Sequence, residues 1–307
     1  MNKTDVSVVI PVFNSKETLH ELCSRIDSTL RQTDKSYELI LVDDGSRDES
    51  WSEIEKIKAG SAFNISAIRL SKNFGQHNAI LCGFNFCKGE VVITMDDDLQ
   101  HPPEEIPKLI STYERTGADI VYGLPLNKKH STVRNAGSFM VRKTSDHTNS
   151  KNKSGSSFRL VKVSLTNKLL QNHSHNFLFI DAVLAWYTGK IETVDVEHHP
   201  RKAGASGYTI RKLIMTYFDI LINYSAGPLR ILTYGGLFLS VMFFFVGLRF
   251  VYRKIFHDVP LGYTSLIVSV LFSTSLILFC LGIIGQYLYK LYQLQNRRPP
   301  YSIETQL

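Results

Sequence analysis

The stretch Val91-Val92-Ile93-Thr94-Met95-Asp96-Asp97-Asp98-Leu99-Gln100-His101-Pro102-Pro103 decides the fold of this chain. An apolar run ends in three consecutive carboxylates, which is the pattern of a buried strand followed by a polar loop. In an open α/β sheet such a strand delivers its last side chains to the crevice where ligands bind. Two acidic groups held there predict a Mg²⁺ or Mn²⁺ site that substrate phosphates complete. A solvated acidic turn is the alternative interpretation, because Asp is common in turns.

Other strands and helices alternate along the chain on both sides of this stretch. Apolar runs predict strands, and apolar residues at helical spacing predict helices between them. The strands are expected at 6–11, 38–42, 65–70, 91–95 and 120–122, and the helices at 15–31, 49–59, 76–87 and 103–116. This alternation predicts an α/β fold with a mainly parallel sheet and helices on both faces.

Polar residues also follow the first three strands, where they face the same crevice. They are Asn14 after the first strand, which ends at Pro11, Asp43 and Asp44 after the second, and Lys72 and Asn73 after the third. A carboxylate can accept the N–H of a nucleobase, the backbone around a proline can wall the base, and a lysine can reach a phosphate. A turn leading into a helix cap explains the pair of aspartates equally well when it is taken alone. Jointly, the equivalent positions favour a nucleotide site.

The last quarter of the chain is much more apolar. Residues 231–251 contain a single charged residue, Arg249, and residues 265–287 contain none. Each segment is long enough to cross a hydrocarbon core of roughly 30 Å as a helix. We therefore expect a transmembrane hairpin within 231–290 that leaves both chain ends on the same side. A buried helical hairpin in a soluble protein is the alternative.

Composition and flanking segments indicate where the remainder of the chain lies. No secretory signal pattern is found at the start, and the four cysteines form no disulfide or metal-ligand framework, as expected in a reducing compartment. The net charge of +7 suits an anionic membrane surface or a phosphate-bearing substrate. No stripe of basic and aromatic residues suggests nucleic acid as a partner.

Two further segments complete the expected organisation. Residues 127–157 predict a mobile loop near the site, or equally a solvated linker. Residues 208–230 carry a broad apolar side and predict an interfacial helix, with a core helix as the alternative. The expected domains are thus a cytosolic catalytic domain at 1–207, the interfacial region at 208–230, the hairpin at 231–290 and a cytosolic tail at 291–307.

The order of these motifs resembles family 2 glycosyltransferases of the GT-A fold. More narrowly, it is similar to the membrane-anchored polyprenyl-phosphate glycosyltransferases, a group that includes dolichol-phosphate mannose synthase and undecaprenyl-phosphate glucosyl and aminoarabinosyl transferases. The motifs that carry the resemblance lie at 7–14, 42–48, 73–79, 96–103, 201–208, 227–230 and 285–287. The first and fourth indicate the superfamily, whereas the later ones and the hairpin indicate the lipid-phosphate branch.

The resemblance implies roles for particular residues. The family's uridine-nucleotide contacts fall on Pro11, Asp43 and Asp44, and its D-x-D metal pair falls on Asp96 and Asp98. Asp98 would be the closer ligand of Mg²⁺ or Mn²⁺ and a catalytic residue, with Asp97 as the variable middle position. The predicted nucleotide-sugar set is completed by Asn14, Lys72, Asn73 and Gln100. The acceptor phosphate is already ionised, so a strong general base is unnecessary.

The sequence departs from the family at one catalytic motif. Many relatives carry Gly-Asp-Phe-Arg-Leu where this chain has Ser156-Ser157-Phe158-Arg159-Leu160. Asp181 is the nearest acidic substitute and is predicted as catalytic; a residue that satisfies backbone N–H groups at a helix start is the equal alternative. The lipid phosphate is expected to contact Arg159, Arg201, Lys202 and Ser206. The adjacent His198 and His199 diverge on any regular element, which favours a structural role over metal ligation.

The expected function is the inverting transfer of one hexose-type sugar from a nucleotide donor, a UDP-sugar, to undecaprenyl phosphate. The product would serve cell-envelope or lipopolysaccharide modification, and the enzyme would be a multi-pass protein of the bacterial inner membrane. The expected partners are a nucleotide sugar, polyprenyl phosphate, membrane lipid and further copies of the chain, since relatives form homo-oligomers. The alternatives are a processive polysaccharide synthase, whose Gln-x-x-Arg-Trp motif is absent, and a non-catalytic nucleotide-binding membrane scaffold.

Overall fold

The computed structural model describes residues 4–61, 63–126, 156–172, 180–199, 262–295 and 299–307, together with single positions between 234 and 256. The chain divides into two units. One unit contains a β-sheet with its helices and the other contains a long helix. Each unit is described by itself.

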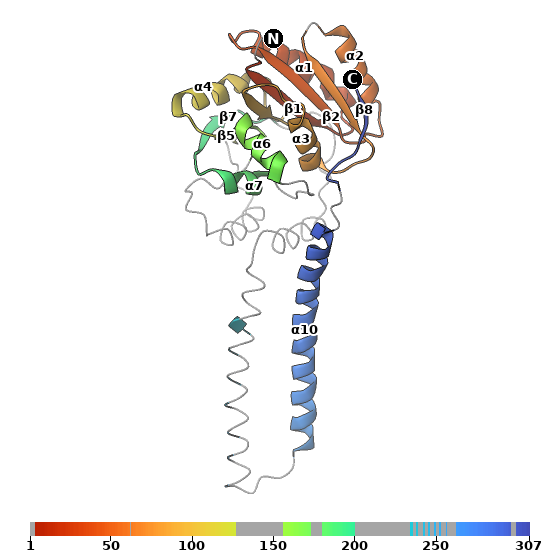
Figure 1. Cartoon of the computed structure of the whole chain (residues 1–307), viewed down its shortest axis with the longest axis vertical. Coiled ribbons are helices and arrows are strands. Elements are labelled where there is room, and N and C mark those ends of the chain that lie inside the picture. The colour runs from red at the N-terminus through yellow and green to blue at the C-terminus, as the bar shows by residue number, and fades with distance from the viewer. Residues whose placement is uncertain are drawn as a thin grey trace. The chain divides into compact units, whose positions relative to one another are not determined.

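An eight-stranded sheet forms the frame of the first unit (Figure 1). Its strand order is β7-β5-β6-β4-β1-β2-β3-β8. The strands are β1 (Val6–Val12), β2 (Tyr37–Asp43), β3 (Ile65–Leu70), β4 (Val91–Thr94), β5 (Ile120–Pro125), β6 (Arg159–Lys162), β7 (Ile191–Val196) and β8 (Ile303–Gln306). β1 pairs in parallel with β2 and β4, β2 with β3, and β5 with β7, whereas β6 and β8 pair antiparallel to their neighbours. The predicted α/β fold with a mainly parallel sheet is therefore confirmed.

Helices cover both faces of this sheet. They are α1 (Lys16–Leu30), α2 (Ser50–Gly60), α3 (Gln76–Phe84), the 3-10 helix η1 (Pro103–Glu105), α4 (Ile106–Thr116), α6 (Val163–Asn172) and α7 (Ile180–Tyr187). Alternate residues of β1 point to opposite faces. Val8 and Ile10 join the core cluster formed with α1, α2 and α4. Val9 lies on the other face, where a Cβ added to Gly83 of α3 would meet its side chain.

Two antiparallel strands were not expected from the sequence. β6 begins at Arg159, a position predicted as a phosphate ligand, and lies between β4 and β5. β8 lies within 291–307, which was predicted as a plain tail, and it forms the edge of the sheet next to β3. Each has four residues, too few to establish a strand pattern when the partner strand is distant in the sequence.

The second unit contains α10 (Tyr263–Gln295), a helix of 33 residues that covers the predicted span at 265–287. Counting only the residues that the structure describes, no helix combines the length and hydropathy required to cross a membrane. The predicted interfacial helix at 208–230, most of the predicted span at 231–251 and residues 127–155 of the predicted loop lie outside the described residues.

Candidate active site

The carboxyl ends of β1, β2, β3 and β4 meet at one edge of the sheet. Their register sets this alignment, because Val12 pairs with Asp43, Asp43 pairs with Arg69, and Val9 pairs with Thr94. The loops that follow these strands therefore begin side by side. These loops, together with the last residues of β1 and β2, carry all the residues predicted for the nucleotide sugar and the metal.

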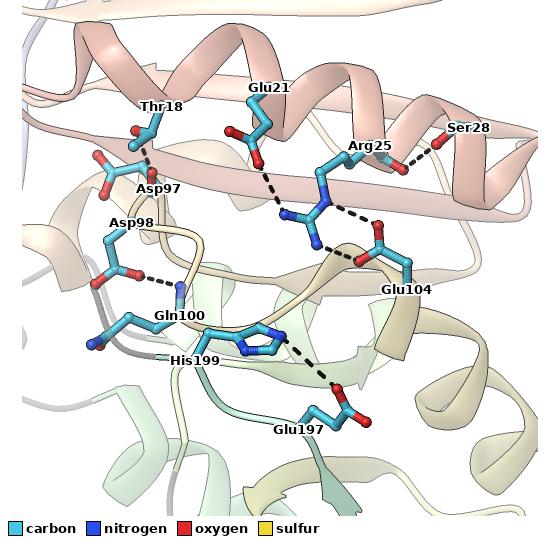
Figure 2. A network of polar contacts seen from close by, with 10 residues as sticks. All are labelled: Thr18, Glu21, Arg25, Ser28, Asp97, Asp98, Gln100, Glu104, Glu197 and His199. Atoms are coloured by element: carbon cyan, nitrogen blue, oxygen red, sulfur yellow. Dashed lines mark hydrogen bonds and ion pairs between the residues drawn. The ribbon is translucent and has the colours of Figure 1, made fainter. Parts of the chain in front are cut away.

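Asp97, the middle residue of the acidic run, fastens the loop after β4 to the loop after β1. Its Oδ2 accepts hydrogen bonds from the backbone N–H of Phe13, at 3.0 Å, and from the hydroxyl of Ser15. Its carbonyl oxygen accepts a 2.7 Å hydrogen bond from the hydroxyl of Thr18 on α1, as Figure 2 shows. Burial raises the pKa of Asp97 to about 6. The position expected to be variable thus has a structural function in this chain.

Asp96 is held from two sides. The side-chain amide of Gln76, the first residue of α3, donates to Oδ1 of Asp96, and the hydroxyl of Ser157 donates to Oδ2 at 2.7 Å. Ser157 stands at the position where the family resemblance implies an acidic residue. Its own carbonyl oxygen accepts a 2.7 Å hydrogen bond from the hydroxyl of Thr94. The serine therefore orients the first carboxylate of the run and fixes the start of β6 against β4.

Asp98 is 8% exposed and lies at a sharp turn of the chain. Its Oδ1 accepts a 3.1 Å hydrogen bond from the backbone N–H of Gln100 (Figure 2). Between them Leu99 has a φ of +58°, which is uncommon for a residue other than glycine. The carbonyl oxygen of Gln100 accepts a 2.8 Å hydrogen bond from the N–H of His199, beyond β7. The acidic loop is thereby tied to the segment that leads to the predicted lipid-phosphate residues.

The side chains of Asp96 and Asp98 offer only oxygen ligands. Among the residues that the structure describes, no group of three or more His, Cys, Asp or Glu side chains could hold a metal ion. Mg²⁺ binds through one or two carboxylates when substrate phosphates and water complete its shell. Two aspartates at the carboxyl edge of the sheet therefore fit a divalent ion that arrives with a phosphate-bearing ligand.

Asp44 connects the loops after β2 and β3. Its Oδ1 accepts a 2.7 Å hydrogen bond from the N–H of Phe74, and its Oδ2 accepts a 2.9 Å hydrogen bond from the N–H of Gly75. Burial raises the pKa of Asp44 to about 6. Gly45 brings the same two loops into contact, since its φ is +67° and an added Cβ would lie 2.5 Å from the carbonyl carbon of Lys72.

Asp43 is 0% exposed at the end of β2. Its Oδ1 accepts a 3.1 Å hydrogen bond from the N–H of Ser46, and its Oδ2 lies 3.5 Å from Nε of Arg69. Burial raises the pKa of Asp43, while hydrogen bonds from Ser46 and the charge of Arg69 act in the opposite direction. Asp43 is thus a buried carboxylate beside the cation of Arg69.

The remaining predicted nucleotide residues surround this pair of aspartates. Pro11 is buried in β1 opposite Val42. Asn14 donates its N–H to the hydroxyl of Ser46 at 2.9 Å and accepts the N–H of Arg47 at 2.8 Å. Lys72 and Asn73 are exposed, and the ammonium group of Lys72 lies 5.2 Å from the ring centroid of Phe74.

Arg159 and Asp181 form an ion pair behind the acidic loop. Arg159 is 1% exposed, and its Nη1 contacts Oδ1 of Asp181. Its Nε donates a 3.0 Å hydrogen bond to the hydroxyl of Thr94, and the hydroxyl of Tyr122 donates to Asp181 at 2.9 Å. The lipid-phosphate contact proposed for Arg159 and the catalytic role proposed for Asp181 stay predictions. The other predicted phosphate ligands, Arg201, Lys202 and Ser206, lie outside the described residues.

His101 brings three motifs together. Its ring stacks on Phe158, with the centroids 5.2 Å apart, and meets the ring of His198 edge-on at 5.0 Å. Burial lowers the pKa of His101 to about 4, so it is a neutral packing residue at pH 7. Sequence reasoning did not assign His101, Gln76 or Ser157 to the site. The signal available for Gln76 was its place at the start of the helix that follows the third strand.

A mainly parallel sheet with an acidic loop at its carboxyl edge defines the GT-A-like class of α/β fold. Glucosyl-3-phosphoglycerate synthase from Mycobacterium tuberculosis, solved with phosphoglyceric acid, shares this fold with a TM-score of 0.51 and 18% identity, over 70% of this chain and 79% of that one. The same enzyme solved with Mn²⁺ and UDP-glucose gives a TM-score of 0.51 and 17% identity, over 71% and 77% of the two chains.

Sequence comparison gives the family. The family model for glycosyl transferase family 2 matches residues 7–185. The chain is 34% identical to the undecaprenyl-phosphate 4-deoxy-4-formamido-L-arabinose transferase of Proteus mirabilis (strain HI4320), over 97% of this chain and 93% of the relative. The corresponding transferase of Photorhabdus laumondii subsp. laumondii gives the same identity and coverage. The chain therefore belongs to glycosyl transferase family 2 and is a glycosyltransferase.

Proposed function

We propose that this glycosyltransferase moves a single sugar from a nucleotide donor, a UDP-sugar, to polyprenyl phosphate, with undecaprenyl phosphate as the acceptor. The observation that carries the proposal is similarity over 97% of the chain to transferases named for that acceptor. Because the similarity extends beyond the family domain at 7–185 into the C-terminal region, it supports the acceptor as well as the reaction.

The loops at the carboxyl edge would hold the donor. Asp43 would accept the N–H of the base beside the wall formed at Pro11, while Lys72 and Asn73 would reach the phosphates. Asn14 and Asp44 connect neighbouring loops through their hydrogen bonds, and the carbonyl oxygen of Gln100 connects the acidic loop to His199, which supports a preformed pocket. The geometry favours one adjustment, because both oxygens of Asp44 already accept backbone N–H groups. Asp44 would shape the pocket while Asp43 contacts the base.

Asp96 and Asp98 would hold Mg²⁺ or Mn²⁺, as they fit an ion delivered with phosphates. When bound, that ion would neutralise the negative charge of the departing nucleoside diphosphate. Gln76 and Ser157 orient Asp96, and the turn at Leu99 orients Asp98, so both carboxylates are placed before the donor arrives. The ionised lipid phosphate can then attack the sugar carbon in a single displacement, which inverts its configuration.

The membrane arrangement is part of the proposal. Large apolar side chains of α10 are exposed, namely Leu266, Val270, Phe272, Ile277, Phe279, Leu281, Ile284, Leu288 and Leu291. Exposed apolar surface of this extent is unfavourable in water and suits contact with lipid. We propose that α10 and residues 231–251 form a transmembrane hairpin, that 208–230 lie at the interface, and that the catalytic domain at 1–207 faces the cytoplasm at a bacterial inner membrane.

The test is transfer by the full-length protein in membranes. Undecaprenyl phosphate and Mn²⁺ are supplied with a panel of radiolabelled nucleotide sugars, including UDP-glucose and UDP-4-deoxy-4-formamido-L-arabinose. Mass spectrometry of the lipid product should show one added sugar from one donor of the panel. A polymer would instead support a processive synthase, and the absence of both transfer and donor binding would support a scaffold.

Two matched variants test whether sugar transfer depends on the acidic loop. Asp98→Ala should abolish transfer while membrane insertion and the amount of protein stay unchanged. Asp34→Ala, which removes an exposed carboxylate from the loop after α1, should transfer at the rate of the wild type. Substantial metal-dependent turnover by Asp98→Ala would remove the metal site from Asp98.

A further inference from the structure

The C-terminal segment 301–307 is hydrogen-bonded to the chain from Ala67 in β3 to Ser71 just after it. Leu307 exchanges two backbone hydrogen bonds with Ala67, at 2.9 and 3.2 Å, and the N–H of Ser71 donates to the carbonyl oxygen of Ser302 at 2.9 Å. The side-chain amide of Asn85, at the end of α3, donates to the hydroxyl of Tyr301 at 2.6 Å. The segment therefore supports β3 and α3, which flank the loop that contains Lys72 and Asn73.

The pairing of β8 with β3 contains one irregularity. Arg69 is opposite Thr305, but Leu70 is opposite Ile303, so Glu304 has no partner in the ladder. An extra residue of this kind re-aims a side chain, and such bulges are frequent beside active sites. In a regular ladder Glu304 would lie opposite Leu70 and point to the other face. Here its carboxylate lies 3.5 Å from Nε of Arg69.

Arg69 therefore lies between two carboxylates. Its Nε is 3.5 Å from Oδ2 of Asp43 on β2 and 3.5 Å from Oε2 of Glu304 on β8. Its guanidinium also lies 5.9 Å from the ring centroid of Trp51 on α2. Oδ2 of Asp43 and Nε of Arg69 are both buried without a hydrogen-bond partner among the described residues. The alternating charges of Asp43, Arg69 and Glu304 compensate the burial of these two atoms.

We propose that Glu304 is a positioning residue for the nucleotide donor, because it holds Arg69 beside Asp43. The inference rests on the proposed function, in which Asp43 receives the base. Asp43 accepts an N–H more strongly when it is ionised, and the neighbouring Arg69 charge favours that form. The side chain of Arg69 is long and 34% exposed, so a single partner leaves it free to rotate away. Glu304 supplies the second partner, and the bulge places it there.

The test measures donor KM, kcat and UDP binding in the full-length protein. Glu304→Gln keeps the length of the side chain and removes its charge; we expect donor KM and the Kd for UDP to rise about two- to fivefold, as for loss of a partly exposed ion pair. The kcat and the KM for undecaprenyl phosphate should stay unchanged. Arg69→Gln should raise donor KM roughly tenfold or more, because it removes the cation from a buried carboxylate.

Two comparisons separate positioning from general support of the sheet. Glu114→Gln is the matched control, since Glu114 has the same 51% exposure as Glu304 and pairs with Lys35 on another part of the domain. It should leave donor KM unchanged. In the Arg69→Gln background, Glu304→Gln should add no further increase, because its effect passes through Arg69.

The inference would be overturned if Glu304→Gln left donor KM and UDP affinity unchanged, or raised them equally with and without Arg69. A fall in kcat with unchanged donor KM would also overturn it. These results are distinct from failure of the proposed function, in which the wild-type protein would neither bind UDP nor transfer sugar to undecaprenyl phosphate.

Discussion

The hydroxyl of Ser157 donates a 2.7 Å hydrogen bond to Oδ2 of Asp96. A neutral side chain thus orients Asp96, the first carboxylate of the acidic loop, at a position where the family resemblance implies an acidic residue. An aspartate at position 157 would put a second negative charge beside Asp96 unless a cation intervened. The neighbouring acid is instead Asp181, which is partly exposed and whose charge Arg159 compensates.

Ser157→Ala should lower kcat about three- to tenfold, because Asp96 loses one of the two groups that orient it. The fold should be retained, since the carbonyl oxygen of residue 157 still accepts from Thr94. Initial rates at saturating donor and Mn²⁺ provide the measurement. Ser156→Ala is the control, because that hydroxyl accepts from the N–H of Phe158 and does not contact Asp96. Equal losses in both variants would contradict the role of Ser157.

Asp181→Ala should lower the free energy of unfolding by about 3 to 5 kcal/mol, because it leaves the buried guanidinium of Arg159 without its counterion. The paired replacement Arg159→Met with Asp181→Leu should recover most of that loss, because neither of the two positions then carries a charge. Thermal unfolding of the full-length protein in detergent checks both values.

The control for this ion pair is Arg25→Gln, which breaks the exposed pair between Arg25 and Glu104 shown in Figure 2. Its effect should stay below about 1 kcal/mol. If Asp181→Ala were as stable as Arg25→Gln, the pair would not be a structural element of the domain. Activity that stays lost in the stable paired replacement would show that Arg159 or Asp181 also serves the reaction.

Gly45→Ala should destabilise the domain by about 1 to 3 kcal/mol and raise donor KM. The positive φ disfavours alanine, and the new methyl group would push the Lys72 backbone away from Asp44. Unfolding midpoints and donor titrations measure the two effects. Gly60→Ala, at the end of α2 with open space around its Cα, should be neutral or slightly stabilising. A neutral Gly45→Ala would contradict the close approach of the two loops.

Asp44 should make stability depend on pH. Its pKa is about 6 in the fold and 3.8 when unfolded, so the folded state binds the proton more tightly. Proton binding by Asp44 therefore contributes up to about 3 kcal/mol to the free energy of unfolding. This contribution is fully present below pH 3.8 and is lost as the pH rises through 6. Asp44→Asn removes this contribution. The wild type should therefore gain stability relative to Asp44→Asn as the pH is lowered from 7 to 4, and a constant difference would contradict the raised pKa.

The long periodic segments could be predicted from the sequence, and the short distant ones could not. The expected bounds of β3 agree with the structure, and each of the five predicted strands is present. β6 escaped prediction because it opens with a buried arginine, whose counterion lies 22 residues later at Asp181. A charged residue within a strand pattern indicates a solvent-exposed position unless its ion-pair partner is known.

The candidate site shows the same division. Parallel strands place their carboxyl ends together, so the sequence could predict that the loops after β1 to β4 meet. It could not assign Asp97 or Glu304, because these side chains act on residues far along the chain: Phe13 lies 84 positions before Asp97, and Arg69 is reached only through the bulge in β8. Such roles depend on register, which local patterns do not contain.

The place of β8 has a consequence for biosynthesis. This strand leaves the ribosome after every other strand of the sheet and after α10. Until then β3 presents a bare row of N–H and C=O groups, the kind of edge on which nascent chains aggregate. Closure of this edge of the catalytic domain therefore waits for β8, and substitutions that weaken the pairing of β8 with β3 would prolong the exposure of that edge.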